Sequence, residues 1–250
     1  MIVVDERNAR AIGLAQELRG LLPRGWKPPE GTAIVIGGDG FLLRTVAAHG
    51  FDHAWLGLNA GNMGFLLNEA AEPKNVAEKL AAGRWQTYPF PLVEARIVLG
   101  SGQERIERAI NDVYLERMSG QAALLRLSLN GHEVFDQLVA DGIIFATALG
   151  STGYAYSAGG EPLHPRLRVL QVAPICAHRP RVPPVVLPED AFAEVEILQS
   201  DKRPVRAVTD GRGIDDVRHV RVSLSSQSVH LSYFDDHDFT RHLLRTVVQT

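Results

Sequence analysis

Two kinds of hydrophobic pattern follow one another along the first third of the chain. Apolar residues recur at helical spacing over residues 9–22, and a short apolar, β-branched run at 32–36 is typical of a strand buried on both faces. A helix over 41–49, a strand over 55–58 and a helix over 73–82 follow in the same way. Because strands alternate with helices, the pattern predicts a parallel, doubly wound sheet.

After Tyr88-Pro89-Phe90-Pro91 the apolar residues recur with period two, which is typical of strands with one buried face. Strands are predicted at 93–99, 125–129, 142–147, 195–198, 205–208, 217–224 and 229–234. Asn130-Gly131 predicts a two-residue hairpin, because both residues tolerate positive φ. Helical spacing returns over 239–248.

The predicted fold class is an α/β N-terminal domain with a doubly wound, mostly parallel sheet, followed by a β-rich C-terminal domain. We expect the α/β domain to span residues 1–88 and the β-rich domain to span 89–237. The tail helix, within 238–250, has an apolar face that needs a partner. We expect this C-terminal helix to pack back on the first domain.

Composition excludes several classes of protein. The chain has 250 residues, with 26 Lys and Arg against 29 Asp and Glu, and a net charge of -3 gives no general attraction for nucleic acid or an anionic membrane. No apolar run approaches the roughly 18 residues of a membrane-spanning helix. The lone Cys176 cannot form an internal disulfide, and the charged start of the chain is unlike a signal peptide. We expect a soluble, cytoplasmic protein.

A glycine-rich turn, Gly37-Gly38-Asp39-Gly40, follows the first buried strand. Ligands bind beyond the carboxyl ends of such strands, and glycines let the backbone turn tightly and approach an anion closely. Asp39 would repel a phosphate, so we interpret it as a Mg²⁺ ligand or as the acceptor of a proton from an attacking hydroxyl. The alternative is an ordinary helix N-cap. Arg44, one turn into the next helix, is either a contact for the phosphates or a solvated surface residue.

A loop rich in small and hydroxyl residues follows the strand predicted at 142–147. Ser151, Thr152 and Ser157 offer hydrogen bonds there, and Tyr154 adds an aromatic surface with a polar tip. Such a loop suits the base and ribose of a nucleotide. The alternative is a turn whose hydroxyls cap a short helix.

Asn111 and Asp112 are adjacent polar residues within an otherwise apolar run. Buried amide and carboxylate groups need partners. An Asn can read the edge of an adenine, and an Asp can hold a ribose diol. The alternative is a β-bulge or a turn.

Together these motifs resemble those of the NAD kinase family, whose members phosphorylate the 2′-hydroxyl of the adenosine ribose of NAD to form NADP. The resemblance covers GGDG at 37–40, GLNAGNMGFL at 57–66, the Asn-acidic pair at 111–112, the block with GST-x-Y-x-x-SAGG at 141–160, and Asp210-Gly211. GGDG alone also occurs in diacylglycerol and sphingosine kinases and in phosphofructokinases. The block at 141–160 distinguishes this chain from them.

The resemblance implies that Asp39 is the catalytic base and that Gly37, Gly38 and Gly40 shape the phosphate-donor loop. It implies NAD-binding roles for a further set of residues: Asn59 near the diphosphate, Asn111 and Asp112 at the adenine and a ribose, Thr152, Tyr154 and Ser157 in the adenosine pocket, and Asp141 at the nicotinamide end. It also implies a donor-bound Mg²⁺ in place of a metal held by the protein, and a homodimer or homotetramer.

Phe41 stands where the family usually has Thr, so the donor is left open between ATP and inorganic polyphosphate. Asp112 stands in place of the usual Glu, with one methylene fewer and the same charge. Two other functions remain open at the level of the residues. One is a GGDG-type kinase acting on a lipid or sugar, and the other is a non-catalytic sensor that binds NAD or NADP.

Overall fold

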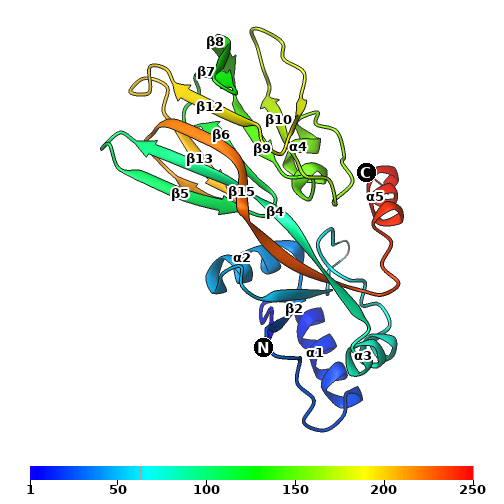
Figure 1. Ribbon diagram of the computed structural model, residues 1–250. Coiled ribbons are helices and arrows are strands. Elements are labelled where there is room, and N and C mark those ends of the chain that lie inside the picture. Colours follow the sequence, from blue (N-terminus) through cyan, green and yellow to red (C-terminus); the bar gives the residue numbers. More distant parts are fainter. Residues whose placement is uncertain (62–63, 250) are drawn as a thin grey trace. The chain divides into compact units, whose positions relative to one another are not determined.

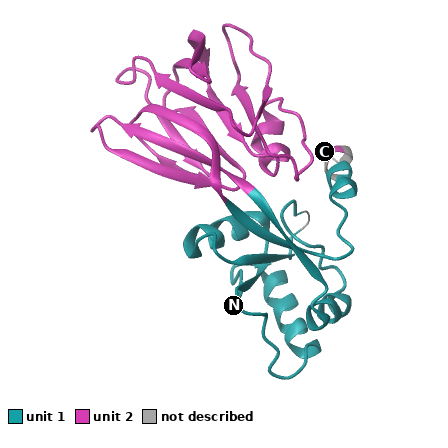
Figure 2. Cartoon of the chain, in the orientation of Figure 1, with its two compact units in different colours: residues 1–90, 228–246 teal, residues 91–227, 247–250 magenta. Residues whose placement is uncertain are grey.

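The computed structural model describes residues 1–61 and 64–249, and only the backbone at 246, 248 and 249. Asn62 and Met63, which belong to the predicted motif at 57–66, lie outside the described residues, as does Thr250 at the end of the predicted tail segment. The chain forms two compact units (Figure 2). Unit 1 comprises Met1–Phe90 and Ser228–Thr246, and unit 2 comprises Pro91–Gln227 and Val247–Thr250.

Unit 1 is the predicted α/β region (Figure 1). Its strands are β1 (Ile2–Val4), β2 (Thr32–Gly37), β3 (Ala54–Asn59) and the last part of β15 (Val217–Phe234), and they are parallel in the order β1-β2-β3-β15. Its helices are α1 (Ala9–Leu21), α2 (Asp39–His49), α3 (Pro73–Ala82) and α5 (Phe239–Gln249). The predicted fold class and the order of these elements are confirmed.

Helices cover both faces of this sheet. Leu18 of α1 and Leu80 of α3 belong to one core cluster with Ile36 and Leu58 of the strands. Leu42 of α2 lies against the opposite face, where it approaches Gly57. Side chains alternate along a strand, so neighbouring positions of β3 serve the two faces and the sheet is doubly wound.

The start and end of α3 follow from its sequence. Pro73 occupies the first helical turn, where its missing N–H costs nothing, and Gly83 ends the helix with a φ of +67°.

The tail helix α5 begins at Phe239, whose ring packs edge-on against Tyr88, Phe90 and Tyr233 of unit 1. The apolar partner that the tail pattern required is this aromatic cluster.

Unit 2 consists of two sheets with one core. The first contains β4 (Trp85–Leu99), β5 (Glu104–Ala109), β7 (Ala123–Leu129), β8 (His132–Ala140), β12 (Phe192–Ile197) and the first part of β15. The second sheet contains, in order, β11 (Val185–Pro188), β10 (Val169–Ile175), β9 (Gly142–Ala146), β6 (Asp112–Arg117), β13 (Val205–Thr209) and β14 (Arg212–Ile214). Fully buried residues of both sheets, among them Ile97, Leu125 and Phe145, form the common core.

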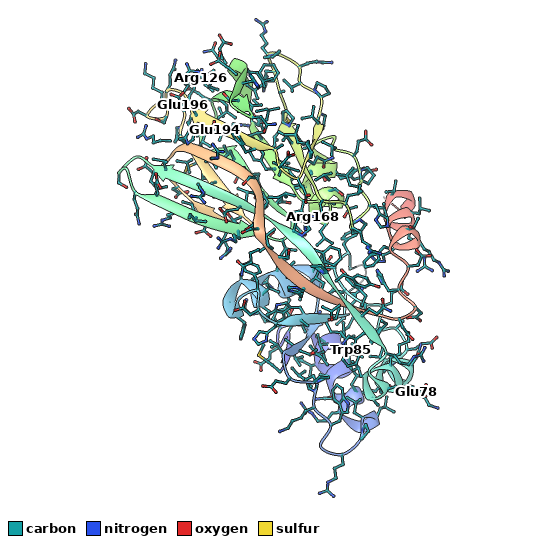
Figure 3. The ribbon with its side chains drawn as sticks, viewed as in Figure 1. Glu78, Trp85, Arg126, Arg168, Glu194 and Glu196 are labelled. Carbon is teal, nitrogen blue, oxygen red and sulfur yellow. The ribbon has the colours of Figure 1, made fainter. Side chains whose placement is uncertain are left out.

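Paired charges cover the outer face of the first sheet. Arg126 of β7 and Glu196 of β12 are directly opposite in the register and form an ion pair of 2.6 Å between Nη1 and Oε2 (Figure 3).

The Asn130-Gly131 hairpin joins β7 and β8 with φ values of +50° and +76°, which confirms the predicted turn. No helix in the described part of the chain is long and apolar enough to cross a membrane.

Two predicted strand boundaries are wrong. The strands predicted at 217–224 and 229–234 are one continuous strand, β15, because Ser225 takes a buried position and hydrogen-bonds there to Arg108 and Glu94. A run of serines and glutamine indicates a loop when it is read locally, and these distant partners remove the need for one.

The strand predicted at 93–99 begins earlier, at Trp85, because β4 runs through Tyr88-Pro89-Phe90-Pro91. Prolines two residues apart lack their N–H groups on the same side of a strand, so the hydrogen bonds to the neighbouring strand on the other side are unaffected.

The helix predicted at 41–49 begins two residues earlier, at Asp39. Strands β1, β5, β6, β10, β11 and β14 had no prediction.

Candidate functional site

The glycine-rich turn lies where β2 ends and α2 begins (Figure 1). Gly37 is the register partner of Asn59 at the end of β3, and the Ala60 N–H donates to the Gly37 carbonyl at 2.9 Å. The carboxyl ends of two parallel strands therefore bring the GGDG loop and the loop after Asn59 together, as the sequence predicted for a ligand site of an α/β sheet.

One of the two predicted reasons for the glycines, the tight turn, is wrong. None of Gly37, Gly38 and Gly40 has a positive φ, so a tight turn does not require them. A Cβ on Gly37 would lie 2.7 Å from Cδ1 of Phe41, whereas a Cβ on Gly38 would meet nothing within 4 Å. Gly37 makes room for the Phe41 ring, and Gly38 leaves open space beside the start of α2.

The Asp39 carboxylate is fixed by the loop that follows β3. Its Oδ2 accepts the Phe65 N–H at 2.7 Å, and its Oδ1 accepts the Leu66 N–H at 3.1 Å. The N-cap of α2 is Gly38, and Asp39 is the first residue of the helix. The alternative of an N-cap aspartate is therefore wrong, and the carboxylate instead joins the two predicted loops.

Burial raises the pKa of the Asp39 carboxyl above its ordinary value. The two backbone N–H groups and the charge of His242 in α5 act in the opposite direction and favour the ionised form. Asp39 in turn raises the pKa of Tyr233, a tyrosine whose buried position is the main cause of its shift. Asp39 is thus a partly desolvated carboxylate in a fixed orientation.

Two further predicted residues lie beside this loop. Arg44 is exposed on α2, and one of its guanidinium nitrogens, Nη1, would lie 3.4 Å from a Cβ on Gly40. The Asn59 side-chain oxygen accepts the Gly61 N–H at 2.8 Å, which makes Asn59 part of the turn that follows β3.

In unit 2, the Asn111-Asp112 pair contacts the loop that follows β9. The Thr147 hydroxyl donates to the Ile110 carbonyl at 2.7 Å, and the Thr147 N–H donates to the Asn111 carbonyl at 2.9 Å. A Cβ on Gly150 would lie 2.2 Å from the Asn111 carbonyl oxygen, so the loop packs directly on this backbone. Two motifs that the sequence separates by more than 30 residues are therefore in contact.

Asn111 lies in a bend, and Asp112 begins β6. The Asn111 Oδ1 is buried and accepts no hydrogen bond from the described residues. Burial, and after it the charge of Asp210, raises the pKa of Asp112 to about 7. A buried acceptor without a partner beside a desolvated carboxylate is costly for folding alone, which points to a ligand.

Asp210 contacts the Asn111-Asp112 pair, although the sequence assigned it no role beyond its place in the Asp210-Gly211 motif of the resemblance. Its carboxylate accepts the N–H groups of Ile110 at 2.7 Å and Asn111 at 3.0 Å. The available signal was an Asp-Gly pair between two short β runs, which is typical of a tight hairpin.

The loop after β9 contains a 3₁₀ turn (Gly150–Thr152) and the short helix α4 (Tyr154–Ser157). The Tyr154 ring stands edge-on to Tyr114 at 4.9 Å, and burial, followed by the charge of Glu116, raises the pKa of Tyr154. Thr152 is half-buried and Ser157 is exposed. Ser151 is fully buried, and its hydroxyl donates to the Ala148 carbonyl and accepts the Leu163 N–H, so for Ser151 the structural alternative holds.

Asp141 lies at the far end of β9 from Asp112. The register pairs Asp112 with Ala146, which is five residues from Asp141, so Asp112 and Asp141 lie about 17 Å apart along the strand at ~3.4 Å a residue. Asp141 forms an ion pair of 2.7 Å between its Oδ1 and Nε of Arg117. The charges of Asp112 and Asp141 both contribute to the raised pKa of Tyr154. These three predicted residues therefore lie around the second sheet of unit 2.

No cluster of three or more His, Cys, Asp or Glu side chains suited to hold a metal ion occurs among residues 1–61 and 64–249. Among the described residues, Asp39 supplies a carboxylate at the GGDG loop, and Arg44 supplies a positive charge. This donor set fits a metal ion that arrives on a phosphate ligand better than a cage of protein ligands.

An α/β unit with a GGDG loop and a fixed, half-buried carboxylate, followed by a β-rich unit, defines a kinase of the GGDG type. The whole chain superposes on the structure titled as an NAD kinase from Archaeoglobus fulgidus in complex with ATP, with a TM-score of 0.79 at 23% identity over 100% of this chain and 98% of that one. This likeness shows a common fold.

Residues 110–232 match the model of the ATP-NAD kinase C-terminal domain. The chain is 33% identical to the NAD kinase of Zymomonas mobilis over 98% of its length and 96% of that protein. It is 37% identical to the NAD kinase of Cereibacter sphaeroides over 87% of its length and 86% of that protein. The chain belongs to the NAD kinase family, which does not favour the lipid or sugar kinase alternative.

Proposed function

We propose that the protein is an NAD kinase, which transfers a phosphoryl group from ATP, or from inorganic polyphosphate, to the 2′-hydroxyl of the adenosine ribose of NAD and so forms NADP. The match to NAD kinases over nearly the whole chain supports this substrate. In the reaction, a bond forms between the 2′-oxygen and the terminal phosphorus of the donor. The bond to the leaving phosphate breaks and releases ADP or shortened polyphosphate.

The observation that carries this proposal is the fixed orientation of the Asp39 carboxylate on the Phe65 and Leu66 N–H groups. A general base must be held in place, and its affinity for a proton must suit the reaction. Burial raises the pKa of Asp39 and so increases that affinity. Asp39 takes the proton of the 2′-hydroxyl as its oxygen attacks, and later releases it to solvent.

Unit 2 supplies the residues that we propose bind NAD. The buried Oδ1 of Asn111 is suited to accept a hydrogen bond from the adenine amino group, and the Asp112 carboxylate is suited to accept one from a ribose hydroxyl. The remaining assignments are Thr152, Tyr154 and Ser157 at the adenosine, Asp141 at the nicotinamide end and Asn59 of unit 1 near the diphosphate.

The phosphate donor is assigned to the GGDG loop of the α/β domain. Open space at Gly38 lets phosphates approach the first N–H groups of α2, and the positive end of the helix dipole favours them. Arg44 is exposed on the first turns of the same helix and supplies a positive charge. Mg²⁺ enters as a complex with the donor phosphates and neutralises part of their charge.

We further propose that the protein acts in the cytoplasm as a homodimer or homotetramer. The support for self-association is the edge strand β11, where Val185 and Val186 are exposed. An uncharged, apolar strand edge favours pairing with another chain.

The test is an assay of the purified protein with NAD, Mg²⁺ and either ATP or polyphosphate, in which NADP is detected by an NADP-specific dehydrogenase. Formation of NADP with one donor or both is expected. NAD binding without NADP formation would favour the non-catalytic sensor, and phosphorylation of a lipid or sugar in place of NAD would contradict the proposal.

A further inference from the structure

Asp210 lies at the tip of a two-residue hairpin between β13 and β14. Thr209 and Arg212 are register partners, and Asp210 and Gly211 between them have φ values of +43° and +81°. Two positive φ values define a type I′ turn, in which Asp, Asn and Gly are preferred. Turn geometry alone would account for the residue type at this position, but not for where its side chain lies.

The Asp210 side chain reaches the bend that carries the NAD-binding pair. Its Oδ2 accepts the Ile110 N–H at 2.7 Å, and its Oδ1 accepts the Asn111 N–H at 3.0 Å and approaches the Asp112 N–H at 3.5 Å. The Asp210 N–H donates in return to the Asp112 carbonyl at 3.2 Å. Three consecutive residues of the bend are therefore tied to one side chain about 100 positions later in the chain.

The contact of Asp210 with this bend brings the carboxylates of Asp112 and Asp210 together in a site from which water is largely excluded. A side chain that served only to form the turn would not need to carry a charge there. Burial raises the pKa values of both Asp112 and Asp210, and the charge of Asp210 adds to the shift at Asp112. An amide in place of Asp210 would satisfy the turn without this repulsion. A carboxylate, however, accepts neighbouring N–H groups with both of its oxygens, and such charge-assisted bonds are about twice as strong as neutral ones.

We propose that Asp210 is a positioning residue of the NAD site, whose carboxylate fixes the Ile110–Asp112 bend so that the side chains of Asn111 and Asp112 are oriented for the adenosine part of the substrate. This inference rests on the proposed function. Asp210 itself does not touch the substrate. Its loss affects NAD recognition and leaves the donor site in unit 1 unchanged.

The chain offers a matched control at the other type I′ hairpin of unit 2. Asn130 occupies the same turn position, has a φ of +50°, and accepts the Phe192 N–H through its side-chain oxygen at 2.9 Å. Asp210→Ala and Asn130→Ala both remove the first central residue of a type I′ turn and a side chain that accepts backbone N–H groups, at least two for Asp210 and one for Asn130. Only the first is predicted to release the Asn111-Asp112 bend.

The experiment measures the KM for NAD, the KM for ATP, kcat and the thermal midpoint of the parent protein and both variants. Both variants are expected to lower the thermal midpoint, Asp210→Ala by more because Asp210 accepts more backbone N–H groups. Asp210→Ala is expected to raise the KM for NAD about 10- to 100-fold, as small misplacements of binding groups do, with the KM for ATP unchanged. Asn130→Ala should change neither KM.

Asp210→Asn serves if the alanine variant does not fold, because Asn keeps the turn preference and one acceptor oxygen. It is expected to raise the KM for NAD less than Asp210→Ala would. An unchanged KM for NAD in a folded Asp210 variant of an active parent would overturn this inference alone. A parent protein that forms no NADP would instead overturn the proposed function, and this inference with it.

Discussion

Asp39 combines two roles, as the proposed base and as the acceptor that joins two loops of unit 1. In Asp39→Asn the side chain can no longer take a proton, and its amide group faces one of the two N–H donors. We expect kcat for NADP formation to fall about 10²- to 10⁴-fold, the usual contribution of a general base. The affinity for NAD, measured by calorimetry, should stay within a few-fold.

Asp5→Asn is a suitable control for this variant, because the Asp5 carboxylate also accepts a backbone N–H in unit 1, from Arg7 at 3.1 Å. It should retain full kcat. A fully active Asp39→Asn protein would remove Asp39 from the reaction.

Asp112 gives the protein a measurable pH dependence. An aspartate in an unfolded chain has a pKa near 4, whereas burial and the charge of Asp210 raise that of Asp112 to about 7. Between those pH values the folded chain holds a proton that the unfolded chain has lost, so the stability that this group contributes is present below pH ~4 and lost as the pH rises through about 7.

Asp112→Asn should therefore raise the free energy of unfolding at pH 8, on the order of 2 kcal/mol, and change it much less at pH 5. Denaturant unfolding at the two pH values measures the difference. The parent should bind NAD better at pH 8 than at pH 6, because the ribose hydroxyl prefers the ionised carboxylate. The same substitution should weaken NAD binding and remove this improvement. A stability difference that does not vary with pH would contradict this assignment.

At the scale of elements, the loop after β9 and the bend before β6 depend on a close backbone contact. A Cβ on Gly150 would lie 2.2 Å from the Asn111 carbonyl oxygen, and backbone cannot move aside as a side chain can. We expect Gly150→Ala to destabilise the protein by about 1–3 kcal/mol and to raise the KM for NAD. Gly120→Ala, where a Cβ meets nothing within 4 Å, is the control in a thermal melt and should change neither quantity.

Local signals were sufficient for many elements. The Pro73 start and Gly83 end of α3 and the Asn130-Gly131 hairpin each follow from a few adjacent residues, because backbone conformation is decided there. The same holds for the helix α1, whose apolar spacing marks its buried face.

The features that the sequence did not show depend on distant partners. The backbone donors of Asp39 lie 26 and 27 residues away, those of Asp210 about 100, and the Glu94 contact that lets Ser225 stay in a strand spans 131. A pattern within ten residues cannot distinguish an N-cap from an acceptor for another loop. The residue types of the candidate site were therefore predictable, but their partners were not.

At the scale of the whole molecule, the edge strands of unit 2 differ in their protection. The edge strands β5, β8 and β14 carry charged side chains, among them Glu133 and Asp136 of β8, whereas β11, with sequence Val-Val-Leu-Pro, carries no charge. Charges on an edge strand oppose pairing with another chain. If the protein is a homodimer or homotetramer, β11 is the edge expected to take part.

Val186→Lys should then reduce the mass measured by light scattering to that of a single chain. Val134→Lys on β8 is matched in exposure, at 43% against 44%, and should leave the mass unchanged. Dissociation by both variants or by neither would exclude the β11 edge as the contact, and a monomeric parent would exclude self-association itself.

The boundaries of the two units fall inside β4 and β15, at Phe90/Pro91 and Gln227/Ser228. On the ribosome, residues 91–227 emerge before the segment 228–234, which contributes the fourth parallel strand of the N-terminal sheet. The half of the protein that is synthesised first is thus completed last. A nascent chain that stops near residue 227 should bury the core of its second half, while β3 pairs with β2 but still lacks β15 on its other side. Premature termination therefore leaves an unpaired strand edge in the N-terminal sheet, which chaperones and proteases can reach.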